Sequence, residues 1–253
     1  MYEDFAFVYD RLMDADYTAF ADGYEAIFRR FGMNPHMVLD LGCGTGTLTA
    51  MMAKRGYEMI GVEGSPEMLS VAREKAEEAG EDILYLCQDM TEFELYGTVD
   101  AAYSSLDSIN YLLSEEDVIK TFRWVNNYLL DGALFIFDLN SPYKLKEILG
   151  NNTFVNEEDG IFYTWENEYD EESKKCTFYL NLFCEEPGGT YSRMVEEQQE
   201  RAYTEEEIRR LLEASGMELL AVYGKDFASA PAECEERLIF VAKAHNHNKV
   251  NES

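Results

Sequence analysis

The sequence predicts an α/β protein built on a doubly wound, mostly parallel seven-stranded sheet, with an antiparallel β meander inserted after the fifth strand. Between residues 37 and 140, short apolar runs bounded by Gly and Asp alternate with helical patterns, as in a sheet covered by helices on both faces. Residues 151–201 are instead rich in Tyr, Phe, Thr and Trp, with turn signals between the runs. Residues 202–244 return to one helical pattern and two apolar strands.

The first part of the chain has strand-like runs with helices between them. The strands are expected at 37–39, 59–62, 83–86, 101–103 and 133–137. The helices are expected over 47–55 up to Gly56, from Ser65-Pro66-Glu67 to Gly80, and from Ser114 to Asp131-Gly132. Right-handed crossovers then bring the carboxyl ends of these parallel strands to one edge of the sheet.

The later elements complete the expected organisation. Meander strands are expected at 161–169, 175–183 and 191–203, then a helix from the capping box at Thr204 to Gly216, then strands at 217–223 and 238–242. We therefore expect one α/β domain over 1–150 and 202–244, an insertion over 151–201, and a flexible polar tail over 245–253.

Composition excludes several classes of protein. The 253 residues include 21 Lys and Arg against 50 Asp and Glu, a formal charge of −29, so we expect no nucleic acid held through its phosphates. No apolar run exceeds five residues, and the acidic start lacks the features of a secretion signal, so neither a membrane span nor export is expected. Five cysteines without a C-x-x-C pair indicate free thiols in the cytoplasm.

The most informative segment is the glycine-rich turn Asp40-Leu41-Gly42-Cys43-Gly44-Thr45-Gly46 between the first strand and the first helix. Glycines there let the backbone turn sharply and approach a ligand closely. A dinucleotide fingerprint would place its third glycine at Thr47, and Asp40 would repel a pyrophosphate while suiting a ligand with positive charge. An NAD-dependent oxidoreductase is therefore the disfavoured alternative.

Two further acids follow the next two strands. Glu63 ends the second strand, where an acid can accept both hydroxyls of a ribose. Asp89 ends the third strand and is placed to bond an adenine amino group, with Met90 packing on the ring. Three carboxylates at successive strand ends line the crevice where open α/β sheets bind ligands.

Together, these residues resemble the three successive motifs of class I S-adenosylmethionine-dependent methyltransferases, in particular small-molecule enzymes with a β insertion after strand five, such as sugar-amine and glycine N-methyltransferases. The resemblance runs from Tyr9 to Ala244 and implies a Rossmann-like fold, S-adenosylmethionine as cofactor and a small-molecule acceptor. Tyr9-Asp10 and Asp16-Tyr17 resemble a segment that closes over the methionine end, which makes 1–30 an expected lid. The segment 104–111 resembles the one that faces the methyl group.

The resemblance implies a set of site residues. The expected cofactor-binding residues are Tyr9, Tyr17, Asp40, Gly42, Cys43, Gly44, Gly46, Glu63, Met68, Asp89, Met90 and Ser105. Met68 is included because Gly64 stands where many relatives have an apolar residue against adenine. The catalytic candidates are Asp107, Asn110 and Tyr111. Asp138-Leu139-Asn140 resembles half of a catechol-type magnesium site, but the adjacent Asp-Asn pair is missing, so no metal is expected.

The expected reaction is methyl transfer to a small molecule, with an amine favoured. The three histidines form no catalytic set; an amine that arrives deprotonated needs no base, whereas a hydroxyl would need Asp107 or Tyr111. The alternative is a non-catalytic cofactor-binding module in an assembly. The insertion is either a substrate cap, with an aromatic wall of residues such as Tyr163, Trp165, Phe178 or Tyr179, or simply core. The oligomeric state is not predicted.

Overall fold

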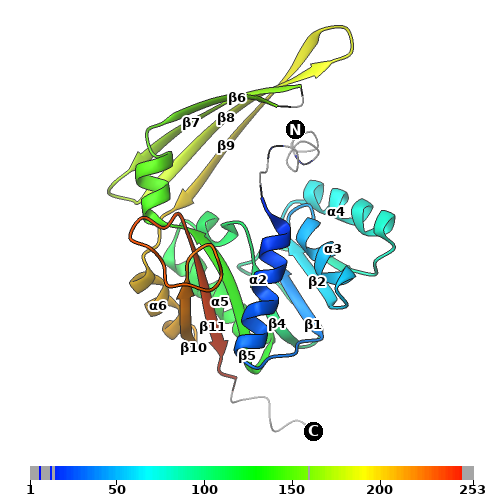
Figure 1. Ribbon diagram of the computed structural model, residues 1–253, viewed down its shortest axis with the longest axis vertical. Coiled ribbons are helices and arrows are strands. Elements are labelled where there is room, and N and C mark those ends of the chain that lie inside the picture. Colours follow the sequence, from blue (N-terminus) through cyan, green and yellow to red (C-terminus); the bar gives the residue numbers. More distant parts are fainter. Residues whose placement is uncertain (1–5, 7–11, 13–14, 159, 247–253) are drawn as a thin grey trace.

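The computed structural model describes residues 6, 12, 15–158 and 160–246, which form two sheets (Figure 1). The larger sheet has seven strands in the order β10-β11-β5-β4-β1-β2-β3. Its strands are β1 (Met37–Leu41), β2 (Glu58–Glu63), β3 (Leu84–Cys87), β4 (Val99–Ser104), β5 (Leu129–Asn140), β10 (Met217–Tyr223) and β11 (Arg237–Ala244). The first five pair in parallel, and β11 and β10 add antiparallel, so the predicted fold class is confirmed.

Helices cover both faces of this sheet. One face carries α2 (Tyr17–Arg30), α3 (Thr47–Lys54) and α4 (Pro66–Ala79); the other carries α5 (Glu115–Tyr128) and α6 (Glu205–Ala214). Successive strand residues serve opposite faces, so Val38 packs in the cluster with α2 and α3 while Leu39 packs in the cluster with α5 and α6. Both are fully buried.

Several helix boundaries follow from the predicted caps. Ser65 accepts a hydrogen bond from the Met68 amide, and Gly80 ends α4 with φ of 70°. Thr204 and Glu207 form the expected capping box of α6.

Two boundaries differ from the prediction. The helix α5 ends at Tyr128, and β5 begins at Leu129, before the expected stop at Asp131-Gly132. Gly132, at φ of +81°, lies inside the strand, where the pairing of β5 with β4 shifts register. The glycine therefore allows an irregularity in a strand instead of ending a helix.

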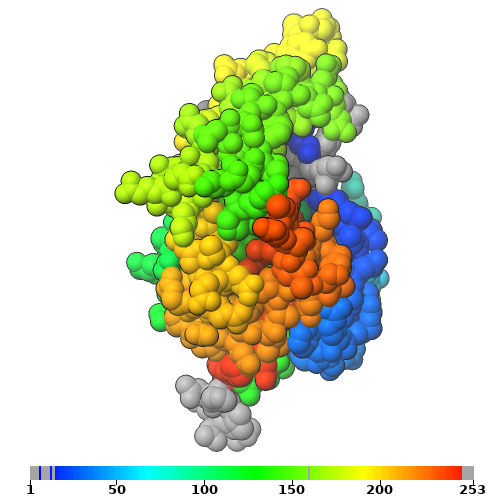
Figure 2. Space-filling view, turned by 60° about the vertical axis from the view of Figure 1, so that its left-hand side comes forward, coloured from blue at the N-terminus to red at the C-terminus, as the bar shows by residue number. Residues whose placement is uncertain are grey.

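The insertion is a four-stranded antiparallel sheet in the order β6-β7-β8-β9, formed by β6 (Thr153–Glu158), β7 (Ile161–Asp170), β8 (Lys175–Glu186) and β9 (Thr190–Arg201). The strand β6 was not predicted, and all six of its residues are exposed. A short π-helical turn, η2 (Lys144–Leu149), joins β5 to the insertion and supplies Leu145 and Leu149 to a small core with Phe178. Figure 2 shows the insertion overhanging the α/β domain.

The N-terminal segment is partly helix. Phe20, Tyr24 and Phe28 of α2 are buried in the main core, with the Tyr24 ring stacked on Tyr103 at 4.7 Å between centroids. The part of the expected lid from Tyr17 onward is therefore packed against the sheet. Tyr9 lies outside the described residues.

Candidate active site

The glycine turn lies at the carboxyl end of β1, and its three glycines have different surroundings. Gly42, Gly44 and Gly46 have φ of +75°, +53° and +71°, a region that favours glycine. A Cβ at Gly46 would lie 2.5 Å from the Tyr85 hydroxyl and 2.8 Å from Ala72 Cβ, so this glycine permits the close packing of α4. A Cβ at Gly44 would meet no protein atom within 4 Å. The turn therefore leaves open space at Gly44, which a ligand can occupy.

The carboxylate of Glu63 is held against this turn from the end of β2. Its Oε2 accepts a hydrogen bond of 3.0 Å from the Gly44 amide, and its Oε1 accepts one of 2.9 Å from the Ser65 amide. Each oxygen keeps a further lone pair, so the carboxylate is fixed in orientation yet can accept ligand hydroxyls.

Of the three residues expected to contact adenine, Asp89 and Met90 follow β3, whereas Met68 lies in α4. Asp89 is anchored through Oδ1, which accepts from the amide and the hydroxyl of Thr91 at 2.7 and 2.6 Å. The Met90 methyl lies 3.3 Å from the position of a Cβ on Gly42, so Met90 lies beside the glycine turn. Met68 instead packs in a cluster with Ile161 of the insertion.

Asp40 lies beneath the turn and is only 2% exposed. The Thr49 hydroxyl donates to its Oδ2 at 2.6 Å. Burial raises the pKa of Asp40 to about 7, the Thr49 hydrogen bond opposes this, and the negative charge of Glu63 adds to it. Asp40 lines a cavity of about 40 Å³ together with Tyr17, Gly42, Cys43, Gly44, Thr45, Thr47, Leu48, Ser105, Leu106 and Ser108.

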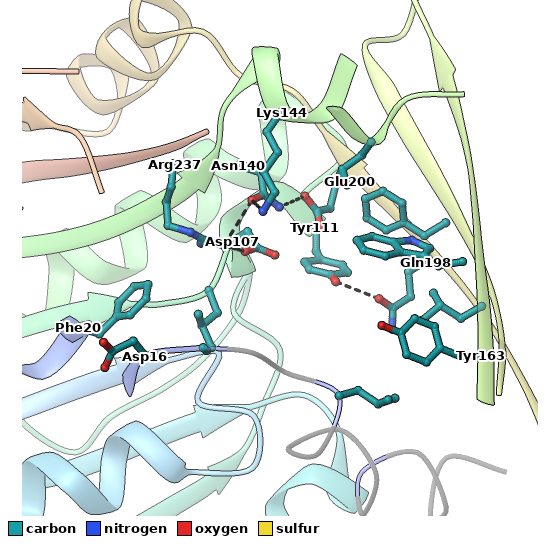
Figure 3. Close-up of a pocket in the computed structure, with 17 residues that line it drawn as sticks. Asp16, Phe20, Asp107, Tyr111, Asn140, Lys144, Tyr163, Gln198, Glu200 and Arg237 are labelled. Carbon is teal, nitrogen blue, oxygen red and sulfur yellow. Dashed lines mark hydrogen bonds and ion pairs between the residues drawn. The ribbon is translucent and has the colours of Figure 1, made fainter. Parts of the chain in front are cut away.

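A second, larger cavity of about 510 Å³ lies between the insertion and the ends of the α/β strands (Figure 3). Its apolar wall comes from the inner face of the insertion and comprises Tyr163, Trp165, Phe178 and Leu180. Its polar side comprises Asp107, Tyr111, Asn140, Lys144, Gln198, Glu200 and Arg237. Leu106 lines both cavities and therefore lies between them.

The insertion has the two faces expected from its period of two. Tyr163 and Trp165 line the cavity, whereas Glu166 pairs with Tyr179 on the outer face. Phe178 lines the same cavity and Tyr179 does not, because consecutive strand residues point to opposite faces.

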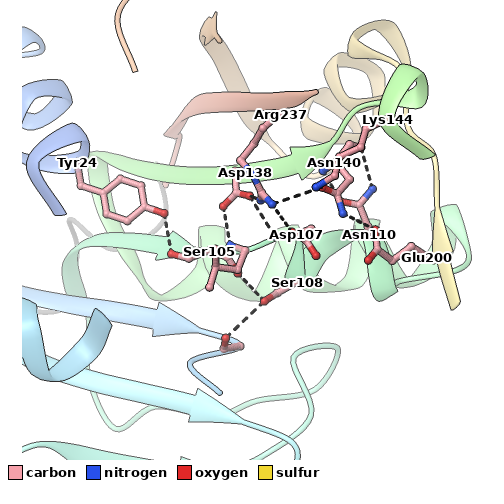
Figure 4. A network of polar contacts seen from close by, with 12 residues as sticks. Tyr24, Ser105, Asp107, Ser108, Asn110, Asp138, Asn140, Lys144, Glu200 and Arg237 are labelled. Carbon is pink, nitrogen blue, oxygen red and sulfur yellow. Dashed lines mark hydrogen bonds and ion pairs between the residues drawn. The ribbon is translucent and has the colours of Figure 1, made fainter. Parts of the chain in front are cut away.

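Figure 4 shows the polar network at the junction of the two cavities. Arg237 of β11 forms ion pairs with Asp138 and, at 2.7 Å, with Asp107. Asp138 also accepts from the amides of Leu106 and Asp107 at 2.8 and 3.1 Å. Both of those residues have positive φ, 55° and 58°, so the network supports a strained turn.

The three catalytic candidates are placed differently. Asp107 and Tyr111 line the large cavity, and the Tyr111 hydroxyl donates to Gln198 at 2.9 Å. Asn110 is fully buried and does not line it; its side chain donates to the carbonyls of Asn140 and Arg201 and accepts from the Asn140 amide. The hydrogen bonds of Asn110 therefore connect the end of β5 to the end of β9.

Sequence reasoning missed Glu200, which β9 carries into the large cavity. Glu200 is 2% exposed as a residue, and its carboxylate accepts a hydrogen bond of 2.8 Å from Asn140, whose Oδ1 accepts one of 2.8 Å from Lys144. Burial raises the pKa of Glu200 well above its ordinary value, and the negative charge of Asp107 adds to this. The segment 151–201 contains 13 acidic residues, and no local motif distinguishes this one.

The strand-end acids and the open glycine turn lie together at the carboxyl edge of the sheet, where open α/β sheets bind ligands. Residues 38–132 match the family model described as a methyltransferase domain. A relative from Geobacillus, whose name classes it as a methyltransferase, is 33% identical over 96% of this chain and 99% of its own length. A crystal structure of an S-adenosylmethionine-dependent methyltransferase from Clostridium acetobutylicum is 33% identical, with a TM-score of 0.89 over 97% of this chain and 99% of that chain.

A more distant structure shares the fold. The sugar N-methyltransferase KedS8 from Streptoalloteichus is 21% identical, with a TM-score of 0.77 over 94% of this chain and 92% of that chain. The protein described here belongs to the S-adenosylmethionine-dependent methyltransferases; it is an enzyme of class I, and its cofactor is S-adenosylmethionine.

The residues present fit this cofactor. The space at Gly44 would allow a close backbone approach, the anchored carboxylate of Glu63 would accept ribose hydroxyls, and the buried acid Asp40 would offer a negative charge to a cationic ligand. In the described part of the chain, no three His, Cys, Asp or Glu side chains are grouped as metal ligands would be. No helix there is long and apolar enough to cross a membrane.

Proposed function

We propose that the enzyme methylates a small-molecule amine bound in the 510 Å³ cavity beneath the insertion. The observation that carries the proposal is the lining of this cavity, which combines an aromatic wall on the insertion with three acids, Asp16, Asp107 and Glu200. Aromatic faces and carboxylates both attract a cationic group. The printed name of KedS8, a sugar N-methyltransferase, is compatible with such an acceptor.

We assign the cofactor to the strand-end crevice. Glu63 would hold the ribose, and Asp89 and Met90 would hold the adenine. The backbone of the Gly42–Gly46 turn would lie against the cofactor. Asp40, Tyr17 and Ser105 would surround the methionine end, because all three line the cavity at the turn. Met68 would affect the cofactor site only indirectly, because it packs against Ile161 of the insertion.

The protein groups have little bond chemistry to perform. When bound, S-adenosylmethionine supplies an electrophilic methyl group on a cationic sulfonium. The protein must align the acceptor and exclude water, which is the contribution of a preorganised site. Leu106 lies between the two cavities, and the Asp138–Arg237 pair fixes its backbone, so this turn would set the direction of approach. Asn110 would serve as a positioning residue.

The net charge of −29 argues against a nucleic acid as the acceptor, because a protein needs a basic surface to bind a phosphate backbone. The non-catalytic assembly module is set aside because the chain is a methyltransferase with a formed cavity beside the cofactor site.

The test is turnover. The protein is incubated with S-adenosylmethionine and a panel of amines, including D-glucosamine, glycine and benzylamine, together with hydroxyl analogues of each. Formation of S-adenosylhomocysteine with amines but not with the hydroxyl analogues is the expected result. Turnover confined to hydroxyl or carboxylate acceptors would refute the amine assignment.

A further inference from the structure

We propose that Glu200 binds the ammonium group of the acceptor and takes its proton, which makes the insertion a supplier of a reacting group as well as a cover. This inference rests on the proposed amine acceptor and names the residue that recognises it.

The charges that line the cavity single out Glu200. Arg237 is already paired with Asp107 and Asp138, so its charge is compensated within the protein. Asp16 accepts a hydrogen bond from the Ala19 amide and caps α2. Lys144 and Glu200 remain, and the amide of Asn140 separates them by bonding to both.

Glu200 has few partners for so buried an acid. Among the described residues, Asn140 is the one hydrogen-bond donor to its carboxylate, and no Lys or Arg lies within 4.0 Å of it. The carboxylate of a residue that is only 2% exposed loses most of its hydration, and one neutral amide replaces only part of it. A cationic ligand would supply the missing partner.

The position of Glu200 suits an acceptor cation. Figure 3 shows Glu200, Asp107 and Tyr111 around the same part of the cavity, with Glu200 on the side of the insertion. Both acids lie on the cavity lining; burial raises the pKa of Glu200, the charge of Asp107 adds to this, and the charges of Lys144 and Arg237 oppose it. Because Asp107 is already paired with Arg237, an ammonium in this part of the cavity would be attracted chiefly to Glu200.

The proton balance is simple. The ammonium transfers one proton to the carboxylate of Glu200, so R–NH₃⁺ becomes R–NH₂ and the carboxylate becomes a carboxylic acid. The electron pair of the broken N–H bond stays on nitrogen as the nucleophilic lone pair. Because the pKa of Glu200 is raised, this transfer is less unfavourable than it would be to an exposed acid.

The test uses benzylamine, which is cationic at neutral pH, and benzyl alcohol, its neutral analogue of similar shape. Calorimetry measures the affinity of each for the full-length protein saturated with S-adenosylhomocysteine. The wild-type protein should bind benzylamine at least about tenfold more tightly than benzyl alcohol, as expected for a charge pair worth about 1.4 kcal/mol or more. Glu200→Gln should reduce the ratio to about one.

The matched control is Glu197→Gln, which removes the same charge from the outer face of the same strand, where Glu197 pairs with Tyr179. It should keep the wild-type ratio. Folding of each variant is checked by its affinity for S-adenosylhomocysteine, which should stay within about threefold of wild type. Equal wild-type affinity for the two probes overturns the proposal without any variant, and so does a preference that persists in Glu200→Gln.

The outcomes separate this inference from the proposed function. If amines are methylated but Glu200→Gln keeps the cation preference, the amine acceptor stands and the role of Glu200 is refuted. If Glu200→Gln abolishes the preference while only hydroxyl compounds are methylated, Glu200 binds cations and the amine acceptor is refuted.

Discussion

Asp138 and Arg237 lie on adjacent antiparallel strands and form a buried ion pair directly beneath the turn that separates the two cavities. The Asp138 side chain is fully buried, and that of Arg237 is 18% exposed. Besides the arginine, Asp138 accepts the amides of Leu106 and Asp107, both of which have left-handed backbones. The pair therefore supports backbone strain at the place where the acceptor would meet the cofactor.

Removing Asp138 should destabilise the fold strongly. Asp138→Ala leaves two buried amides without an acceptor and the guanidinium of Arg237 with Asp107 alone, so we expect a loss of about 3–5 kcal/mol in the free energy of unfolding. Urea denaturation followed by circular dichroism measures it. Asp82→Ala, at an exposed position, should change stability by less than about 0.5 kcal/mol. A loss below about 1 kcal/mol for Asp138→Ala would contradict the supporting role.

The cofactor affinity should rise with pH through the titration of Asp40. Its pKa of about 7 in the free protein means that a cationic ligand, which favours the ionised acid, must displace a proton at lower pH. Between pH 6 and pH 8 the ionised fraction grows from about 0.1 to about 0.9, so the affinity for S-adenosylmethionine should rise about tenfold relative to Asp40→Asn. Calorimetry at both pH values measures the ratio. An identical pH dependence in the variant would exclude Asp40 from the site.

Glu63→Ala should weaken cofactor binding by about 10- to 150-fold, a loss of about 1.5–3 kcal/mol, because two ribose hydroxyls lose a charged acceptor. The substitution also frees the Gly44 and Ser65 amides that the carboxylate holds. Glu58→Ala, at the exposed opposite end of the same strand, is the control and should bind normally. Unchanged calorimetric affinity in a folded Glu63→Ala protein would remove the assignment.

Two glycines of the turn should respond differently to alanine. At either position an alanine loses about 1–2 kcal/mol of stability, because the backbone there is left-handed. Gly46→Ala should lose a further 1–3 kcal/mol, approximately, because its Cβ meets Tyr85 and Ala72. Gly44→Ala has no such contact and should instead reduce cofactor affinity, since its Cβ enters the open space at the turn. Unfolding curves and calorimetry on both variants test this contrast, and normal binding by Gly44→Ala would make the turn purely structural.

The α/β elements were predictable because each depends on local signals. The caps at Ser65, Gly80 and Thr204 satisfy backbone groups within one turn of the chain, so the sequence around them carries the information. The role of Gly132 was predicted wrongly because a glycine can either end a helix or permit an irregularity in a strand. The pairing of β5 with β4, which is not a local signal, determines which of the two occurs. The strand β6 escaped prediction because exposed residues show no alternation of burial.

The large cavity beneath the insertion was far less predictable than the strand-end crevice. The strand-end acids Asp40, Glu63 and Asp89 come from consecutive parallel strands, whose ends must meet at one edge. Glu200 reaches the cavity through the packing of the insertion, whereas Arg237 is placed beside Asp107 by the antiparallel pairing of β11 with β5. Such long-range juxtapositions leave no local motif in the sequence.

The final prediction separates a substrate wall from a simple core in the insertion. Trp165 lines the large cavity and packs against Phe154 and Phe178, with ring centroids 5.4 and 5.7 Å apart respectively. Trp165→Ala should lower kcat/KM for the best amine of the panel by about tenfold or more, because about 1.4 kcal/mol of contact and water exclusion is lost. The affinity for S-adenosylmethionine should stay within about twofold, since Trp165 does not line the cavity at the glycine turn.

The matched control is Tyr179→Ala, which removes an aromatic ring from the outer face of the same sheet and should change neither quantity. Replacing 151–201 by a Gly/Ser linker extends the test, although it also exposes Leu145 and Leu149 at the base of the insertion. The linker variant should keep its cofactor affinity within a few fold and lose methyl transfer. If Trp165→Ala turns over the acceptor at the parent rate, the aromatic side chains form only a core; if the linker variant no longer binds the cofactor, the insertion stabilises the α/β domain itself.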